Sequence, residues 1–321
     1  MFLLRGLAVS FSAFFLVYAA LSVAVAAGSK TFLALCSSWR SQRQLADCLF
    51  WVRLLPLTAA ALITLLFVAP SFLLLEPRGE NERLSIVPLV LGWAGLGLVL
   101  FGLRNAATAV ARTARVVRAW RSGAQAVSCG VSVPVFVMDR EVLPPCAIAG
   151  IVHPTVFISK AASAVLSGPE MQSVIRHEVI HRRRCDNLRK LLFRACAFPW
   201  MSRIENAWAD VTEAAADDAA VSSAGEALDL AAALVKISRL IAVSPAKVGP
   251  QVELTMALVH PGKALPTRVQ RLVGWSRPEP KSAGVQRATY VSALIGACTC
   301  VLFYGPILAG AHAATEWLVT Q

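Results

Sequence analysis

Four apolar stretches, each long enough to cross a bilayer as a helix, are the feature that most limits what this chain can fold into. They run from about Leu7 to Ala27, Leu54 to Leu75, Leu84 to Leu103 and Tyr290 to Ala314, and none contains an internal Asp, Glu, Lys or Arg. A spanning helix needs about 20 apolar residues. With 56% hydrophobic residues and a mean hydropathy of +0.61, the chain is too apolar for an ordinary soluble domain. We therefore predict an integral membrane protein with four spans.

The first stretch has one feature of a secretory signal. Ala24-Val25-Ala26 resembles a small-residue cleavage site. Because the apolar run is longer than a typical signal core, we favour a retained span.

Basic residues in the connecting loops predict the side of the membrane that each loop faces. The loop from Gly28 to Arg53 has four basic residues, whereas the loop from Glu76 to Arg83 mixes three glutamates with two arginines. Because basic loops remain in the cytoplasm, the first loop is predicted inside and the second outside. Basic residues also flank the large segment from Arg104 to Gln286, which we place in the cytoplasm of a bacterium. The N-terminus and the short tail after the fourth span are then external, and Arg5 alone argues against this.

The net charge of +12 lies mostly in loops and beside the spans, where orientation and anionic lipid explain it. A basic stripe recurs every three residues at Arg112, Arg115, Arg118 and Arg121. It predicts a helix that lies along the headgroups or continues the third span, and a solvated basic face explains it equally well. We expect contact with the lipid bilayer and no direct nucleic-acid binding.

The run His177-Glu178-Val179-Ile180-His181 places two imidazoles and a carboxylate where a catalytic zinc ion needs them. Residues four apart on an α-helix share one face, so both His side chains can reach one ion while Glu178 lies beside it. Pro169 suits a helix start, and no Gly or Pro follows it before His181. One helix is therefore predicted to carry the HExxH pattern of zinc-dependent hydrolases.

A catalytic zinc site needs a third protein ligand and a position for water. Glu213 and Asp217 lie one turn apart in an Ala-rich segment that is predicted to be helical. We predict that Glu213 binds the metal, that Asp217 orients a ligand histidine through its second ring nitrogen, and that Glu178 is the general base. Asp186 is a further candidate for orienting a ligand, although helix capping or pairing with Arg182 to Arg184 explains it equally well. A surface His pair and a solvated acidic face remain alternative interpretations of the two motifs.

Secondary-structure patterns place a small sheet before this helix. Val131 to Met138 and Thr155 to Ser159 are β-branched and aromatic runs separated by Pro and Gly, which predict a sheet or hairpin. Zinc proteases commonly hold extended substrates against such a strand edge. The stretch from Ser244 to Pro266 is broken by Pro and Gly and is predicted to be a loop near the cleft. Three helices are predicted, at about Pro169 to Ala195, Arg203 to Ser222 and Glu226 to Ala242.

These segments together resemble the BlaR/MecR-type membrane metallopeptidases. The similarity covers His177 to Leu188, Glu213 to Ala219, Ala147 to Gly150, Val156 to Ser159 and Leu265 to Leu272. It also includes the order of three spans, a cytoplasmic protease domain and a fourth span. The resemblance implies a gluzincin-type zinc endopeptidase that cleaves a cytosolic protein, typically a dimeric winged-helix repressor, after an external signal.

The resemblance also implies roles for single residues. It assigns the zinc ligands to His177, His181 and Glu213, and the base to Glu178. Arg268 matches the family's downstream Arg, which implies a place in the cleft or in stabilising transition-state charge. A homodimer is expected by the same resemblance.

One departure concerns the signal. Antibiotic-sensing members carry an external penicillin-binding domain after the fourth span, whereas here the chain stops at Gln321 with no SxxK-containing domain there. We therefore expect no β-lactam sensing by that route. The signal is expected to arrive through the spans, the short external loop or another protein.

Other membrane zinc proteins remain as alternatives. Quality-control proteases of the HtpX type and CAAX prenyl proteases share both motifs, but they typically place spans between them, and the basic residues within Arg182 to Thr212 leave no room for a pair of spans. The Arg-rich segment after His181 also argues against an intramembrane site-two-type protease. A non-catalytic adaptor with structural zinc needs a fourth protein ligand, for which Cys185 is the nearest candidate. The eight cysteines form no CxxC pair and are expected to be reduced, buried thiols.

The sequence therefore predicts a multi-span α-helical membrane protein with a cytoplasmic α+β zincin-like metalloprotease domain. Residues 1–103 are assigned to three transmembrane helices with their loops, 104–288 to the zinc metalloprotease domain, and 289–321 to the fourth transmembrane helix and a short external tail. The predicted function is a Zn²⁺-dependent endopeptidase that cleaves a cytosolic protein, a transcriptional repressor first among the candidates, in signal transduction. A membrane quality-control protease and a non-catalytic zinc-binding adaptor remain the alternatives.

Overall fold

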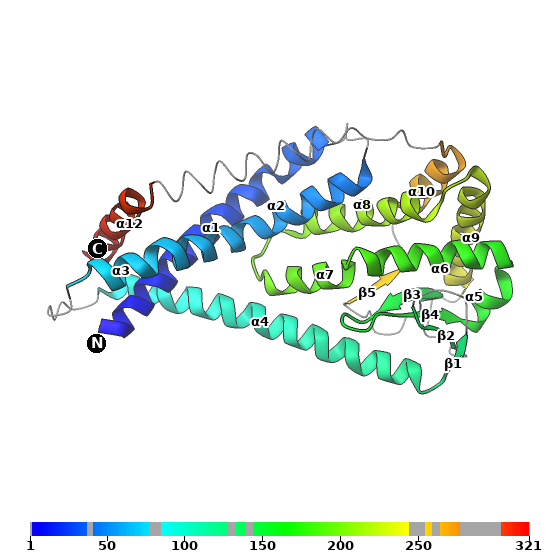
Figure 1. Ribbon diagram of the computed structural model, residues 1–321, viewed down its shortest axis with the longest axis horizontal. Coiled ribbons are helices and arrows are strands. Elements are labelled where there is room, and N and C mark those ends of the chain that lie inside the picture. The colour runs from blue at the N-terminus through cyan, green and yellow to red at the C-terminus, as the bar shows by residue number, and fades with distance from the viewer. Residues whose placement is uncertain are drawn as a thin grey trace.

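The computed structural model describes residues 2–36, 41–77, 85–127, 133–138, 144–243, 254–258, 264–276 and 303–320. Long helices form one end of the molecule, and a small mixed sheet with shorter helices forms the other (Figure 1). The protein is mostly helical, and the long helices run on into the part that contains the sheet.

Three helical segments are long and apolar enough to cross a membrane. They are α1 (Phe2–Cys36), the continuous segment Gln42–Leu75, and α4 (Ile86–Arg121). The second segment consists of α2 (Gln42–Ile63), the π-helical turn η1 (Thr64–Val68) and α3 (Ala69–Leu75). Large apolar side chains on these helices, among them Leu65, Leu74 and Trp93, point outward. Exposed apolar surface on long helices is expected where lipid replaces water as the solvent.

The fourth predicted span, Tyr290 to Ala314, lies in part outside the described residues. Its C-terminal part belongs to α12 (Tyr304–Thr320), which packs against α3 and η1. At the same end, Arg5 Nη2 lies 3.2 Å from Glu76 Oε1, and both side chains are buried. Arg5 and Glu76 therefore form a buried ion pair at this end of the molecule.

Helix α4 continues without a break from Ile86 to Arg121, through the predicted domain boundary between residues 103 and 104. The basic stripe therefore extends the third long helix, one of the arrangements expected for it. At the end of α4, Arg121 Nη2 donates to Thr155 Oγ1 at 2.6 Å. This bond ties the helix to the sheet.

The sheet has five short strands in the order β1-β2-β4-β3-β5. Strands β2 and β4 are parallel, and the other neighbouring pairs are antiparallel. The predicted strands correspond to β2 and β4, whereas β1, β3 and β5 were not predicted. In particular, the predicted loop from Ser244 to Pro266 contains β5, which lines up along β3. The strands are β1 (Ala124–Val127), β2 (Val135–Met138), β3 (Cys146–Ala149), β4 (Thr155–Ser159) and β5 (Thr255–Ala257).

Helices α6 and α9 cover the sheet and share its core, which includes Val156, Ile158, Val174 and Leu234. The predicted helix from Pro169 to Ala195 is wrong as one element, because the chain turns at Cys185, whose φ is 55°. That left-handed conformation ends one helix and starts another in a new direction. The helices here are α5 (Lys160–Val165), α6 (Gly168–Arg183), α7 (Asp186–Ala195), α8 (Ser202–Ala220), α9 (Ala224–Val243) and α10 (Ala264–Val273).

Helix α2 joins the long helices to α7 and α8 through charged contacts. Arg53 is 2% exposed; its Nε donates to Glu205 Oε1 at 2.7 Å and its Nη2 donates to the Cys196 carbonyl at 2.6 Å. Arg189 Nη1 donates to Asp47 Oδ1 at 2.7 Å nearby. These contacts fix α2 to the two helices that follow α6 in the chain.

The cysteines depart in part from the expectation of buried thiols. Cys36, Cys146 and Cys196 are buried free thiols, whereas Cys48 is half-buried and Cys185 is exposed. Cys185 is exposed because its left-handed backbone places it on the outside of the turn between α6 and α7.

Candidate metal centre

Helix α6 is the platform of the site. Its first turn is closed by a capping box, in which Glu170 Oε2 accepts from the Ser167 backbone N–H at 2.7 Å and Ser167 Oγ accepts from the Glu170 N–H at 3.4 Å. Such reciprocal bonds satisfy orphan donors at a helix start. Two turns later, the imidazoles of His177 and His181 point from the same face into the protein and are at most 2% exposed. The helix therefore presents both imidazoles already buried and aligned.

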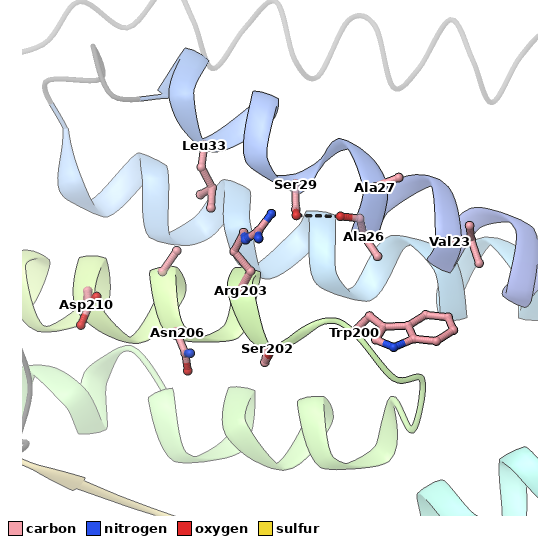
Figure 2. Close-up of a pocket in the computed structure, with 11 residues that line it drawn as sticks. Val23, Ala26, Ala27, Ser29, Leu33, Trp200, Ser202, Arg203, Asn206 and Asp210 are labelled. Carbon is pink, nitrogen blue, oxygen red and sulfur yellow. Dashed lines mark hydrogen bonds between the residues drawn. The ribbon is translucent and has the colours of Figure 1, made fainter.

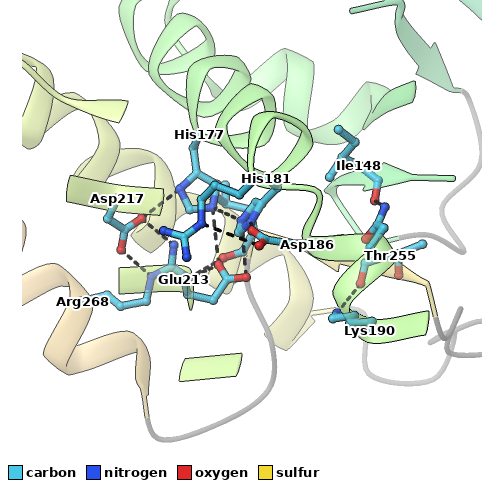
Figure 3. A network of polar contacts seen from close by, with 12 residues as sticks. Ile148, His177, His181, Asp186, Lys190, Glu213, Asp217, Thr255 and Arg268 are labelled. Carbon is cyan, nitrogen blue, oxygen red and sulfur yellow. Dashed lines mark hydrogen bonds and ion pairs between the residues drawn. The ribbon is translucent and has the colours of Figure 1, made fainter. Parts of the chain in front are cut away.

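Three ligand atoms from α6 and α8 converge on one point (Figure 3). His177 Nε2 and His181 Nε2 lie 3.0 Å apart. Glu213 on α8 lies 3.4 Å from His177 Nε2 through Oε2 and 3.5 Å from His181 Nε2 through Oε1. The three residues are also mutually close enough to hold one metal ion.

The spacing of these atoms is close to that of a zinc site. Zinc binds His nitrogen and carboxylate oxygen at about 2.0–2.2 Å, so neighbouring ligand atoms of a tetrahedron lie about 3.3–3.6 Å apart. Each imidazole lies at such a distance from a different oxygen of Glu213, and the His–His separation is slightly shorter. Both Glu213 oxygens are shielded from solvent, and their charged neighbours are the two imidazoles and Arg268, whose Nη1 lies 3.1 Å from Oε2. A buried carboxylate that faces two imidazoles fits a metal ligand.

Each imidazole has a carboxylate at its other ring nitrogen. His177 Nδ1 lies 3.0 Å from Asp217 Oδ1, and His181 Nδ1 lies 2.8 Å from Asp186 Oδ2. A carboxylate in this position fixes the ring and directs Nε2 toward the metal. Asp186 reaches His181 from the first turn of α7, and its other oxygen lies 3.6 Å from Arg184 Nε. Both interpretations of Asp186 that the sequence allowed are therefore present in the structure.

Arg268 on α10 connects this arrangement to the sheet edge. Its Nε and Nη2 each donate to a different Asp217 oxygen at 2.7 Å, and its Nη1 lies 3.1 Å from Glu213 Oε2. The same Nη1 donates to the Leu258 carbonyl at 2.7 Å, directly after β5. Arg268 therefore holds two acidic residues of the site and the end of a strand at once.

The electrostatics of the cluster favour charged carboxylates. Burial alone would raise the pKa of Glu213, but His181, Arg268 and His177 lower it to about 2. Asp217 follows the same pattern, since Arg268 and His177 outweigh burial and lower its pKa. Burial would lower the pKa of His177, but Asp217 and Glu213 raise it to about 9. The site thus concentrates negative charge around two imidazoles, as a cation site requires.

Glu178 lies in a different environment from Glu213. Its side chain is fully buried, and neither carboxylate oxygen has a hydrogen-bond partner among the described residues. Burial raises its pKa, while His177 and His181 act in the opposite direction. A buried carboxylate with a raised pKa next to a metal site is suited to take up and release a proton.

Two residues near the site were not singled out from the sequence. Asn187 Nδ2 donates to the Gly150 carbonyl at 2.8 Å, and Lys190 Nζ donates to the Thr255 carbonyl at 2.6 Å. Burial lowers the pKa of Lys190 to about 8. Both residues lie on α7 within about one turn of Asp186. Predicting a helix start at Asp186 would have placed them near the site.

Strand β5 closes one side of the site. Its register with β3 pairs Thr255 with Ala149 and Met256 with Ile148, so it covers the edge of the strand that packs on α6. A long groove lies elsewhere, between Val23 and Leu33 of α1 and the side chains of Trp200, Arg203 and Asp210 (Figure 2). No residue of the metal cluster lines that groove.

Comparison of the chain with protein-family models, with curated protein sequences and with solved structures finds no match.

Proposed function

We propose that this protein is a membrane-anchored zinc endopeptidase that cleaves a cytosolic protein. The observation that carries the proposal is the group of three residues close enough to hold one ion, with a carboxylate at the other ring nitrogen of each imidazole and the buried Glu178 beside them. Structural zinc sites are closed by four protein ligands, whereas three ligands leave a position for water. Cys185 is exposed and does not belong to the described group, which favours the catalytic alternative over the adaptor.

The donor set favours zinc over other common metals. Two imidazoles and one carboxylate suit Zn²⁺ better than Mg²⁺ or Ca²⁺, which prefer all-oxygen sites. His177, His181 and Glu213 are the residues that would hold it. When bound, zinc would make a coordinated water more acidic and polarise the carbonyl of the scissile bond.

Other residues of the site have separate roles in the proposed reaction. Glu178 takes the proton of the attacking water and passes it to the nitrogen of the leaving amine. Asp217 and Asp186 hold the two imidazoles in the orientation that presents Nε2. Arg268 holds Asp217 in place, which makes it a positioning residue in this structure.

The substrate has to approach Glu178, which is fully buried beside a sheet whose edge strand is β5. An extended, unfolded stretch of a protein suits main-chain pairing along the outer edge of β5.

The cellular setting of the proposal follows from the helices and the resemblance. We place the protein in the cytoplasmic membrane of a bacterium with four spans and the metal centre in the cytoplasm, because basic residues flank the central segment. A dimeric winged-helix repressor is the leading substrate, since the BlaR/MecR-type resemblance implies one. A homodimer of the protease is proposed on the same basis.

Quantitative N-terminal profiling of cytosolic proteins tests this proposal. Cells express the wild type or Glu178→Ala at matched levels. New termini in one small DNA-binding repressor, seen only with the wild type, support protease activity and the signalling role. New termini in many misfolded or membrane proteins support quality control instead. Identical termini in both strains under every inducing condition tried, together with zinc in both proteins, support the adaptor.

A further inference from the structure

A second group of metal-binding side chains lies at the opposite end of the long helices. Glu76 caps the C-terminus of α3, and His312 and Glu316 lie one turn apart on α12. One ligand atom from each of the three lies within 4.8 Å of the others. In Figure 1, the ends of α3 and α12 lie near the N-terminus, far from α6. This second group shares no residue with the cluster on α6 and α8.

The second group is partly shielded from solvent. Glu76 is 8% exposed and its Oε1 lies 3.2 Å from Arg5 Nη2. His312 Nδ1 is inaccessible to solvent and has no hydrogen-bond partner among the described residues. His312 and Glu316 are half-buried, so an ion can still arrive from outside. An imidazole and two carboxylates with ligand atoms this close together supply donors that a divalent cation can use.

The charges of the group point the same way. Glu76 and Glu316 are both acidic, and Arg5 pairs with Glu76. Because the two carboxylates lie close together, they repel each other, and a cation between them relieves that repulsion.

We propose that Glu76, His312 and Glu316 bind a divalent transition-metal ion, with Zn²⁺ as the first candidate and Mn²⁺ as the second. The imidazole disfavours Ca²⁺ and Mg²⁺, while the two carboxylates accommodate either Zn²⁺ or Mn²⁺. Three protein ligands leave open positions, which makes the ion exchangeable. In the proposed topology this site faces the outside of the cell.

An ion at this position would link two segments that are far apart in the chain. Helix α12 packs against α3 and η1, and Tyr304 at its start donates to the Leu66 carbonyl at 2.9 Å. The ion would add a second attachment, between Glu76 and the C-terminal half of α12. Its presence would therefore set how firmly α12 holds the outer end of the long helices. This inference does not depend on protease activity.

The test uses the full chain in detergent micelles, dialysed against buffered free Zn²⁺ or Mn²⁺, with metal content measured per chain. With Zn²⁺, the wild type should bind two ions, and both Glu316→Gln and His312→Ala should bind one. His181→Ala, which removes a ligand of the other cluster, should also bind one. His153→Ala is the matched control, because His153 is exposed and belongs to neither group, and it should bind two.

A second readout separates ligand loss from misfolding. In the His181→Ala background, added Zn²⁺ should raise the melting temperature, and the further change Glu316→Gln, which keeps the size of the side chain, should remove this response. The proposal is overturned if Glu316→Gln and His312→Ala retain the zinc content and the Zn²⁺-dependent melting shift of their parents. It is equally overturned if the His181→Ala protein binds no metal. A failure of the α6 cluster alone would lower the counts of the wild type, Glu316→Gln, His312→Ala and His153→Ala by one. It would leave His181→Ala at one ion and the effect of Glu316→Gln unchanged.

Discussion

Arg268 and Asp217 form a two-point ion pair, in which Nε and Nη2 each lie 2.7 Å from a different carboxylate oxygen. The same Asp217 lies 3.0 Å from Nδ1 of His177. The orientation of His177, a proposed metal ligand, therefore depends on a guanidinium 51 residues further along the chain than Asp217.

Replacing Arg268 should weaken zinc binding although Arg268 is not a ligand. Loss of a group that orients a ligand typically costs about 10–100-fold in metal affinity, and we expect this for Arg268→Ala. Arg268→Lys should rescue little, because an ammonium cannot make the two parallel bonds. Competition with a chelator of known affinity measures the effect. Zinc affinity equal to the wild type in both variants would show that Asp217 needs no support.

The turn at Cys185 gives a prediction that concerns both stability and metal. A residue with a β-carbon in the left-handed region costs about 1–2 kcal/mol. Cys185→Gly should be neutral or slightly stabilising, since the relief is offset by the flexibility of glycine in the unfolded chain. Cys185→Val should be destabilising by about 1 kcal/mol or more.

Both Cys185 variants should keep their zinc, because the thiol is exposed and outside the metal group. Melting temperature and metal content of the purified proteins check the two statements together. Loss of zinc from Cys185→Gly would favour a structural site with a fourth, sulfur ligand.

The contact between α2 and α8 should contribute strongly to stability. Arg53→Met leaves the Cys196 carbonyl without its donor and Glu205 without its cation. An unsatisfied buried group costs about 1–3 kcal/mol, so we expect a loss of that size. Asp47→Asn is the matched control, since the Asp47–Arg189 pair is more exposed and is worth less than about 1 kcal/mol. Equal melting temperatures for the two variants would contradict this ranking.

Glu226 should make stability depend on acid. Its carboxylate accepts from the Ser222 backbone N–H and hydroxyl, each at 2.7 Å, and pairs with Arg176. Ser222 and Arg176 lower the pKa of Glu226 from 4.5 to about 2. A lowered carboxylate pKa stabilises the folded state above the unfolded value, and this contribution is lost as pH falls from 4.5 toward 2.

Glu226→Gln should therefore lower the melting temperature near pH 7 by a small amount, equivalent to no more than about 1 kcal/mol because both partners are partly exposed. The difference between variant and wild type should shrink as the melts are repeated at steps below pH 4.5. A difference that stays constant down to about pH 2 would rule out this carboxylate as the titrating group.

The features that sequence could predict are those with local signals. The long helices follow from uninterrupted apolar runs, and three of them are present as helices able to span a membrane. The pairing of His177 with His181 follows from the helical repeat, as does the placement of Glu213 and Asp217 on one face of α8. The contact between α6 and α8, which brings Glu213 to the two imidazoles, could not be predicted from either segment alone.

The features that escaped prediction depend on tertiary structure. The contact of Asp186 with His181 requires the left-handed turn at Cys185. The sequence pattern predicted one helix through Cys185 and therefore did not predict this turn. Strand β5 is three residues long and exists because β3 offers it an edge. Lys190 donates to the Thr255 carbonyl, and this contact also depends on the position of β5 beside β3. Short Ala-rich strands such as β1 and β3 have weak intrinsic preference, so their neighbours decide their conformation.

The most direct test of the central claim compares purified wild type with Glu178→Gln, on the cytosolic protein that N-terminal profiling identifies. Zinc content and the rate of peptide-bond cleavage are measured on the same preparations. The account predicts equal zinc at the α6 cluster in both proteins, and a cleavage rate at least about 100-fold lower in the variant, because the proton acceptor is gone while the ligands remain. Cleavage at the wild-type rate by zinc-loaded Glu178→Gln would contradict it.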